Sequence, residues 1–367
     1  MATLLSILQE YNLEETLVKI ALNDSIDDKK GLLKGMAMTT TKPIYTQLNF
    51  VIISVENLEE SLRFYTDTIG LNHSPIEECR ANTTKDFWSV SSDTNIRQVL
   101  CFRDNSEIGQ ILLIEFSSKE KTYIKPDQDF GMIRGLWNIN FYVEDILTSV
   151  QVLKSKGYCP WTDPILHKIG ENVGSPIEVI LDGPDRIAIN LVQLPKNSEN
   201  QSIQEICDYF QSNGTTRLGF TEVVTTSHCV QSTADAALFY QHVLGMDMMF
   251  QDTLKSQESN LFLRRPYDGQ TQITFLQGSH HYGKVVLSEP LNYEIPNTID
   301  IARPPNIGYF SQGFFVDSLD LAIRACKELN VVLWQNAVLT IGDYGDCNSL
   351  LVQCPGSDAL IALFEKK

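Results

Sequence analysis

The pattern of apolar residues near the beginning of the chain predicts a short unit of mixed secondary structure. Residues 48–55 are apolar and rich in β-branched side chains, as in a strand that is buried on both faces. Over residues 58–69 the apolar positions recur every three or four residues, which indicates a helix, and Gly70 is a typical helix end. Residues 99–103 and 111–116 are predicted to be strands. The predicted order is βαβββ.

Several stretches of the sequence recur at nearly one offset, which indicates a tandem duplication. Phe64-Tyr65 and the glycine that ends the predicted helix are among the repeated residues. The matched stretches are 61–71 with 236–246 (offset 175), 141–146 with 314–319 (offset 173) and 183–193 with 355–365 (offset 172). Three separate matches at nearly one offset are hard to obtain by chance.

The βαβββ order also fits residues from about 135, 218 and 307 onward, so we predict an α+β fold of four βαβββ modules in two consecutive pairs. Residues 45–195 would form the first paired domain and residues 214–367 the second. Residues 196–213 are predicted to be a linker with a short helix. Residues 1–44 have helical spacing and are expected to be a helical extension; an arm that binds a partner is the alternative.

Composition excludes several classes of protein. With 43% hydrophobic and 20% charged residues the chain is expected to be globular, and a net charge of −17 argues against a surface that binds nucleic acid. No apolar run is long enough to span a membrane, so a cytoplasmic protein without a membrane partner is expected. The eight cysteines are scattered and are predicted to be free thiols. No glycine-rich phosphate loop indicates a nucleotide, and we expect no cofactor.

Four short motifs resemble the vicinal oxygen chelate superfamily, which includes glyoxalases, extradiol dioxygenases and bleomycin-resistance proteins. They are residues 55–58, Phe64-Tyr65, residues 69–71 and the Gly-Pro-Asp-Arg-Ile turn at residues 183–187, and the resemblance extends over residues 45–366. It implies that paired modules enclose a cavity. It also implies a divalent metal held by His or Gln on the first strand of a module and by Glu on the last.

The residues at those positions are poor metal ligands. Counting along the predicted strands places Phe50, Leu112, Asn138 and Asn190 there in the first pair, and Glu222, Thr274, Ser311 and Ala362 in the second. One carboxylate among eight positions would not hold a metal against water, so we predict no metal centre of this type.

The side chains that face each predicted cavity suggest different chemistry. In the first pair they are uncharged aromatic and amide groups, suited to an uncharged aromatic or carbonyl compound unless the amides only bridge strands in a filled core. These residues are Phe50, Gln110, Asn138, Asn140, Tyr142 and Asn190. In the second pair Thr274, Ser311 and Phe315 surround Glu222.

Glu222 is the first candidate for a catalytic acid or base, because burial disfavours the charged form of a carboxyl group. A structural Glu222 bonded to the backbone or to Arg264 is the alternative. His228, in the predicted loop after that strand, is the second catalytic candidate, with a surface or structural role as its alternative.

Three functions remain open. The first is a metal-independent enzyme of cyclase, isomerase or lyase type that acts on a hydrophobic or aromatic carbonyl compound in specialised biosynthesis. The second is a non-catalytic binder that sequesters a small molecule, as the resemblance to bleomycin-resistance proteins implies. The third, which requires a different strand register, is a metal-dependent dioxygenase or glyoxalase. A monomer or a homodimer is expected.

Overall fold

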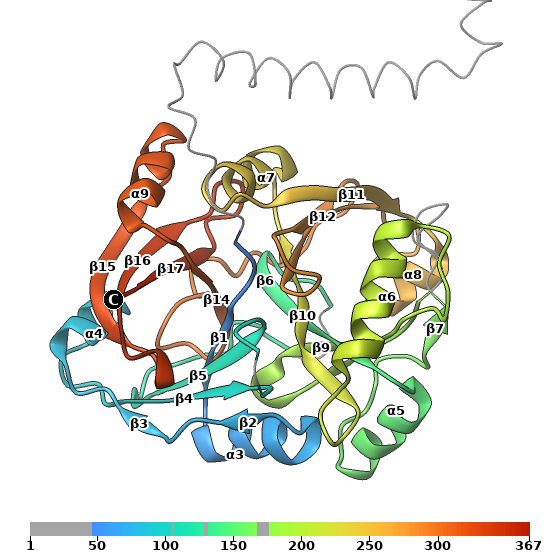
Figure 1. Ribbon diagram of the computed structural model, residues 1–367, viewed down its shortest axis with the longest axis horizontal. Helices are drawn as coiled ribbons and strands as arrows, with labels where there is room; N and C mark the ends of the chain where they lie inside the picture. Colours follow the sequence, from blue (N-terminus) through green and yellow to red (C-terminus); the bar gives the residue numbers. More distant parts are fainter. Residues whose placement is uncertain (1–45, 105, 128–130, 167–175) are drawn as a thin grey trace, which may run out of the picture. The chain divides into compact units, whose positions relative to one another are not determined.

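A computed structural model of the chain describes residues 46–104, 106–127, 131–166 and 176–367 (Figure 1). The helical extension expected over residues 1–44 lies outside the described residues. The rest contains the four predicted βαβββ modules, so this part of the prediction is confirmed.

The first half of the chain holds modules 1 and 2, which share the order of strand, helix and further strands. Module 1 contains β1 (Phe50–Val55), α3 (Leu58–Phe64) with a π-helical turn (Tyr65–Ile69), β2 (Asn72–His73), β3 (Glu77–Glu78), α4 (Asn82–Phe87), β4 (Ile96–Phe102) and β5 (Gln110–Phe116). Module 2 contains β6 (Gly135–Val143), α5 (Ile146–Ser155), β7 (Ile165–Leu166), β8 (Ile177–Asp182), a 3-10 turn (Pro184–Arg186) and β9 (Ala188–Gln193).

The second half follows the linker helix α6 (Gln201–Asn213) and holds modules 3 and 4. Module 3 contains β10 (Phe220–Cys229), α7 (Thr233–His242), β11 (Asp247–Leu254), α8 (Gln257–Phe262), β12 (Thr271–Gln277) and β13 (Lys284–Pro290). Module 4 contains β14 (Gly308–Phe315), α9 (Leu319–Glu328), β15 (Leu333–Thr340), a 3-10 turn (Gly342–Tyr344), β16 (Asp346–Gln353) and β17 (Leu360–Lys366). None of the helices in the described ranges is long and apolar enough to cross a membrane.

Each module's first helix begins at a capping residue. The cap side chain accepts a hydrogen bond from the backbone N–H three residues later, which satisfies one of the unpaired amides at a helix start. These caps are Asn57, Asp145, Ser232 and Ser318. The sequence therefore fixes the turn between strand and helix in the same way in all four modules.

The strands form two sheets, and each sheet joins two modules that are not the consecutive pair expected from the sequence. One sheet has the order β15-β16-β17-β14-β1-β5-β4-β2, which joins module 4 to module 1. The other has the order β11-β12-β13-β10-β6-β9-β8-β7, which joins module 3 to module 2 (Figure 1). The sequence predicted that modules 1 and 2, and then 3 and 4, would pair. The repeat offset identifies equivalent modules but contains no information on which first strands become neighbours.

The centre of the sheet of modules 1 and 4 is filled by aromatic side chains. The Phe50 ring lies 5.1 Å from Phe315, 5.8 Å from Tyr344 and 5.5 Å from Phe364, each in an edge-on arrangement. Gly313 is the neighbour of Phe50 across β1 and β14, and a Cβ atom there would lie 2.9 Å from the Phe50 side chain. The glycine thus makes room for this ring, and the aromatic cluster occupies the middle of the sheet.

Candidate functional site

The sheet of modules 2 and 3 borders a cavity of about 90 Å³, which is space for several water molecules or a small ring. Side chains from β6, β8 and β9 of module 2 and from β10 to β13 of module 3 line it. Two residues of the linker helix α6 complete the wall, and Figure 1 shows this helix beside the module 3 strands. The lining residues are Asn140, Tyr142, Pro176, Glu178, Asn190, Val192, Leu194, Pro195, Ile203, Ile206, Thr225, Met249, Phe250, Phe275 and Lys284.

Four polar residues of this lining form one row across four adjacent strands. Asn190 of β9 pairs with Asn140 of β6, and Asn140 pairs with Thr225 of β10. Thr225 in turn pairs with Lys284, the first residue of β13. The row therefore contains one cavity-facing residue from the first strand and one from the last strand of each module. These residues provide two amides, a hydroxyl and an amine.

The two amides leave hydrogen-bond acceptors without partners. Nδ2 of Asn190 donates to Oε2 of Glu178 at 2.7 Å, and because a carboxylate only accepts, Oδ1 of Asn190 faces away from it. This Oδ1 and that of Asn140 are buried and have no donor within the part of the chain that the structure describes. Buried acceptors of this kind are normally satisfied, so a bound molecule or water with a donor group is expected to complete them.

Lys284 is the only amine of the row and is 2% exposed. Its Nζ donates to the backbone oxygen of His281 and lies 5.8 and 5.9 Å from the ring centres of Tyr142 and Tyr282. No carboxylate among the described residues forms an ion pair with it. Burial lowers the pKa of the Lys284 ammonium from 10.5 to about 7, because a low-dielectric surrounding disfavours the charged form. Near neutral pH this amine can therefore both accept and release a proton.

Apolar side chains form the remainder of the wall. The rings of Phe250 and Phe275 are stacked at 4.3 Å with an angle of 19° between their planes. Ile203 and Ile206 of α6 contribute branched aliphatic surface. A cavity with this wall and a small number of polar groups is typical of a site for a small organic molecule.

Comparison with solved structures identifies the fold. Glyoxalase I from Zea mays matches with a TM-score of 0.57 and 13% sequence identity, over 88% of this chain and 92% of that one. A putative dioxygenase from Bacillus subtilis matches with a TM-score of 0.53 and 9% identity, over 88% of this chain and 86% of that one. The chain has the vicinal oxygen chelate fold. Neither a family model nor a curated protein sequence matches it, so its chemistry has to be argued from its own residues.

The metal implied by the vicinal oxygen chelate fold does not fit the row. Divalent metals of such sites bind imidazole and carboxylate groups, whereas the row offers two neutral amides, a hydroxyl and Lys284, whose protonated form repels a cation. Within the described ranges, no three His, Cys, Asp or Glu side chains are grouped as ligands. Of the ligand positions predicted for modules 2 and 3, Asn190 was assigned correctly to the row. The first-strand position of module 2 is Asn140 and not Asn138. In module 3 the two positions are Thr225 and Lys284, where Glu222 and Thr274 were predicted.

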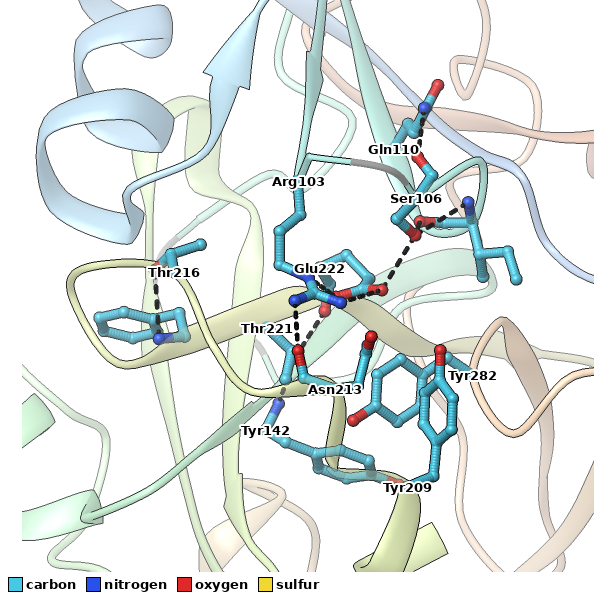
Figure 2. A network of polar contacts seen from close by, with 12 residues as sticks. Arg103, Ser106, Gln110, Tyr142, Tyr209, Asn213, Thr216, Thr221, Glu222 and Tyr282 are labelled. Carbon is cyan, nitrogen blue, oxygen red and sulfur yellow. Dashed lines mark hydrogen bonds and ion pairs between the residues drawn. The ribbon is translucent and has the colours of Figure 1, made fainter. Parts of the chain in front are cut away.

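Glu222 lies outside the cavity lining, in a polar network that connects modules 1 and 3 (Figure 2). Its buried carboxylate accepts from Nε of Arg103 at 2.5 Å and from Oγ of Ser106 at 2.9 Å. Arg103 also donates to the backbone oxygen of Asn213 at the end of α6, at 2.9 Å. The partner is thus Arg103 and not Arg264. These contacts give Glu222 a structural role, and its side chain does not line the cavity.

His228 is fully buried within β10 and not in a loop. Its Nε2 lies 2.6 Å from Oγ of Ser357 and its Nδ1 lies 2.9 Å from the Tyr240 hydroxyl, which donates to Gln312 at 2.5 Å. Burial lowers the pKa of His228 to about 3, so the imidazole is neutral. These contacts hold module 3 against module 4 and match the structural alternative for this residue.

The other predicted binding residues divide between the two sheets. Asn140, Tyr142 and Asn190 lie together in the cavity lining, as expected. The other predicted residues contact their own fold and do not line the cavity. Phe50, Gln110 and Phe315 lie in the sheet of modules 1 and 4, where Ser311 also donates to the backbone oxygen of Gln312. In the other sheet Asn138 accepts from the backbone N–H of Ser227, and Thr274 accepts from the Gln251 amide. Sequence reasoning missed Lys284 and Glu178. For Lys284 a signal existed, because the repeat offsets of 172 to 175 place the equivalent of Gln110 within residues 282–285.

Proposed function

We propose that the chain is a metal-independent enzyme that performs acid–base chemistry on a small hydrophobic or aromatic carbonyl compound, as cyclases, isomerases and lyases do. The site is the cavity between modules 2 and 3. One observation carries the proposal: Lys284 lies where the fold places metal ligands, in a row with two amides and a hydroxyl. The buried amine would supply the proton transfer for which a general acid or base with a pKa near the working pH is best suited.

The other groups suggest how the molecule is held. Phe250, Phe275 and Tyr142 offer aromatic surface to a hydrophobic body. The unpartnered oxygens of Asn140 and Asn190 accept from a hydroxyl or N–H group, so the ligand is expected to carry a donor as well as a carbonyl. The α6 residues limit access of water, which strengthens polar interactions inside the site.

A binder that sequesters its ligand without turnover is the second candidate. Its support is that the described part of the cavity wall is mostly apolar and that Glu178 is the single carboxylate in that part. The two candidates share the ligand and differ in what happens to it.

Native mass spectrometry of the full chain, compared with its denatured mass, tests the proposal. An organic adduct that leaves on denaturation identifies the ligand, and incubation of that compound with fresh protein then distinguishes the candidates: conversion supports the enzyme, and recovery of unchanged compound supports the binder. A mass of one divalent ion per chain would overturn metal independence. The variant Lys284→Met should lose turnover, whereas Gln110→Met, at the equivalent position of module 1, should keep it.

A further inference from the structure

Two of the lysines that the structure describes are buried, and their surroundings differ in a way that bears on reactivity. Lys125 is 5% exposed and its Nζ forms an ion pair with Asp182 at 2.5 Å. Lys284 is equally buried, but its Nζ has only the His281 backbone oxygen as a partner in the described part of the chain. Burial lowers the pKa of Lys125 as well, but the Asp182 carboxylate opposes this by favouring the charged, non-nucleophilic form. The second has no such group and borders a cavity.

We propose that Lys284 forms an imine with an aldehyde or ketone bound in the cavity between modules 2 and 3. This inference rests on the proposed function, since it requires that the ligand is a carbonyl compound. It goes further, because it assigns Lys284 as a covalent nucleophile and not solely as a proton donor or acceptor.

The covalent step balances without a further reactant. The lone pair of neutral Nζ attacks the carbonyl carbon, the C–N bond forms and the π electrons move to oxygen, which takes a proton from the amine nitrogen. The resulting carbinolamine then loses its hydroxyl group with the second nitrogen proton as water, which breaks the C–O bond and leaves a C=N bond. No oxidant or reductant is needed, and hydrolysis reverses both steps.

The groups around Lys284 suit this chemistry. Thr225 is the cross-strand neighbour of Lys284 and lines the same cavity, so its hydroxyl is a candidate to hydrogen-bond to the carbinolamine oxygen. The titratable side chains that face the same space are Tyr142 of β6, Tyr282 just before β13 and Glu178 of β8. A desolvated lysine in an apolar pocket is an established way to obtain a nucleophilic amine. At pH 7, about half of Lys284 is neutral, against roughly one in three thousand for a solvent-exposed lysine.

The test is reductive trapping of the full-length protein with benzaldehyde and sodium cyanoborohydride at pH 7. Limited reaction followed by peptide mapping should find the benzyl group on Lys284 before any other lysine, with a rate advantage of about a thousandfold over exposed lysines from the neutral fraction alone. Benzyl alcohol, which has the same ring and no carbonyl group, should slow labelling of Lys284 and leave surface labelling unchanged.

Two variants serve as controls. Lys284→Arg keeps a cation but cannot form an imine, and should lose the rapid labelling. Lys125→Arg alters the other buried lysine and should retain it. Mapping of the wild-type protein remains decisive if Lys284→Arg does not fold.

The outcomes separate this inference from the proposed function. Rapid labelling of Lys284 that benzyl alcohol suppresses supports both. Binding of benzyl alcohol, measured by native mass spectrometry, without labelling of Lys284 overturns the imine and leaves the carbonyl-binding site standing. If neither probe binds and Lys284 stays unlabelled, both proposals fail.

Discussion

Replacing Lys284 with methionine should stabilise the protein at neutral and acidic pH and should change its pH dependence in a defined way. The Lys284 pKa falls from 10.5 in the exposed chain to about 7 in the fold, so the folded state binds a proton less readily than the unfolded state. Below pH 7 both states carry the ammonium, and the full cost of burying it is present. Between pH 7 and 10.5 the unfolded state binds more protons, so stability rises with pH.

The size of the effect follows from the two pKa values. At about 1.4 kcal/mol for each pH unit, the difference between 10.5 and 7 corresponds to about 5 kcal/mol of destabilisation at low pH. At pH 6 nearly all of this remains, and at pH 9.5 about 1.4 kcal/mol is left. The stability gain of Lys284→Met over the wild type should therefore be about 3 kcal/mol larger at pH 6 than at pH 9.5. Loss of the hydrogen bond to His281 adds a contribution that pH does not change.

Urea unfolding of both proteins at pH 6, 8 and 9.5 measures this difference. Gln110→Met is the matched control, because Gln110 occupies the same strand position in module 1 and does not titrate. Its free energy of unfolding should run parallel to that of the wild type at all three values. If the Lys284→Met curve also runs parallel to the wild type, Lys284 titrates normally, and the reasoning from its burial is refuted.

Three further predictions concern the rest of the fold. Glu222→Gln should lower stability by about 3 to 5 kcal/mol, because Arg103 is left buried without its carboxylate, whereas Glu78→Gln in an exposed pair should change the urea midpoint little. Phe50→Ala should lower stability by about 3 to 5 kcal/mol and leave benzyl alcohol binding unchanged; loss of binding would show that the two sheets are coupled. Burial raises the Asp185 pKa from 3.8 to about 6, so the folded state binds a proton more readily than the unfolded state, and the contribution of Asp185 to stability should fall by about 2 kcal/mol as pH rises from 4 to 6. Asp185→Asn should remove this part of the pH dependence in urea titrations, and an unchanged slope would contradict the prediction.

The sequence predicted the modules because their signals are local. Each signal can be recognised within about ten neighbouring residues. The signals are the spacing of apolar residues, the capping residue before the first helix and the glycine after it. Pairing of the modules depends instead on contacts between β1 and β14 and between β6 and β10, which lie far apart in the sequence. Nothing in a repeat offset distinguishes consecutive pairing from the observed arrangement.

The candidate site was predicted in part for the same reason. Asn140, Tyr142 and Asn190 were assigned to the cavity from the alternation of side chains along their strands, and they line it. Thr274 was predicted to be on the last strand of module 3, but it lies on β12 (Thr271–Gln277), whereas the repeat offset points to β13. That shift concealed Lys284. Glu222 was a poor candidate for a different reason: its partner Arg103 comes from module 1, and no local pattern reveals such a contact.

The two sheets have the same strand plan and differ at their centres, and this difference supports assigning function to one of them. In the sheet of modules 1 and 4 the equivalent row is Gln110, Phe50, Gly313 and Ala362, where two small residues accommodate an aromatic ring and a cluster closes around it. In the other sheet no aromatic side chain occupies the row, and the amine and amides border a cavity. A core under selection for stability alone would be expected to replace a buried lysine that has no carboxylate partner among the described residues with an apolar residue, since that lysine costs the fold several kcal/mol. Its presence in the unfilled sheet is explained if the amine acts on a bound molecule, and the filled sheet then serves as the scaffold that holds this site in place.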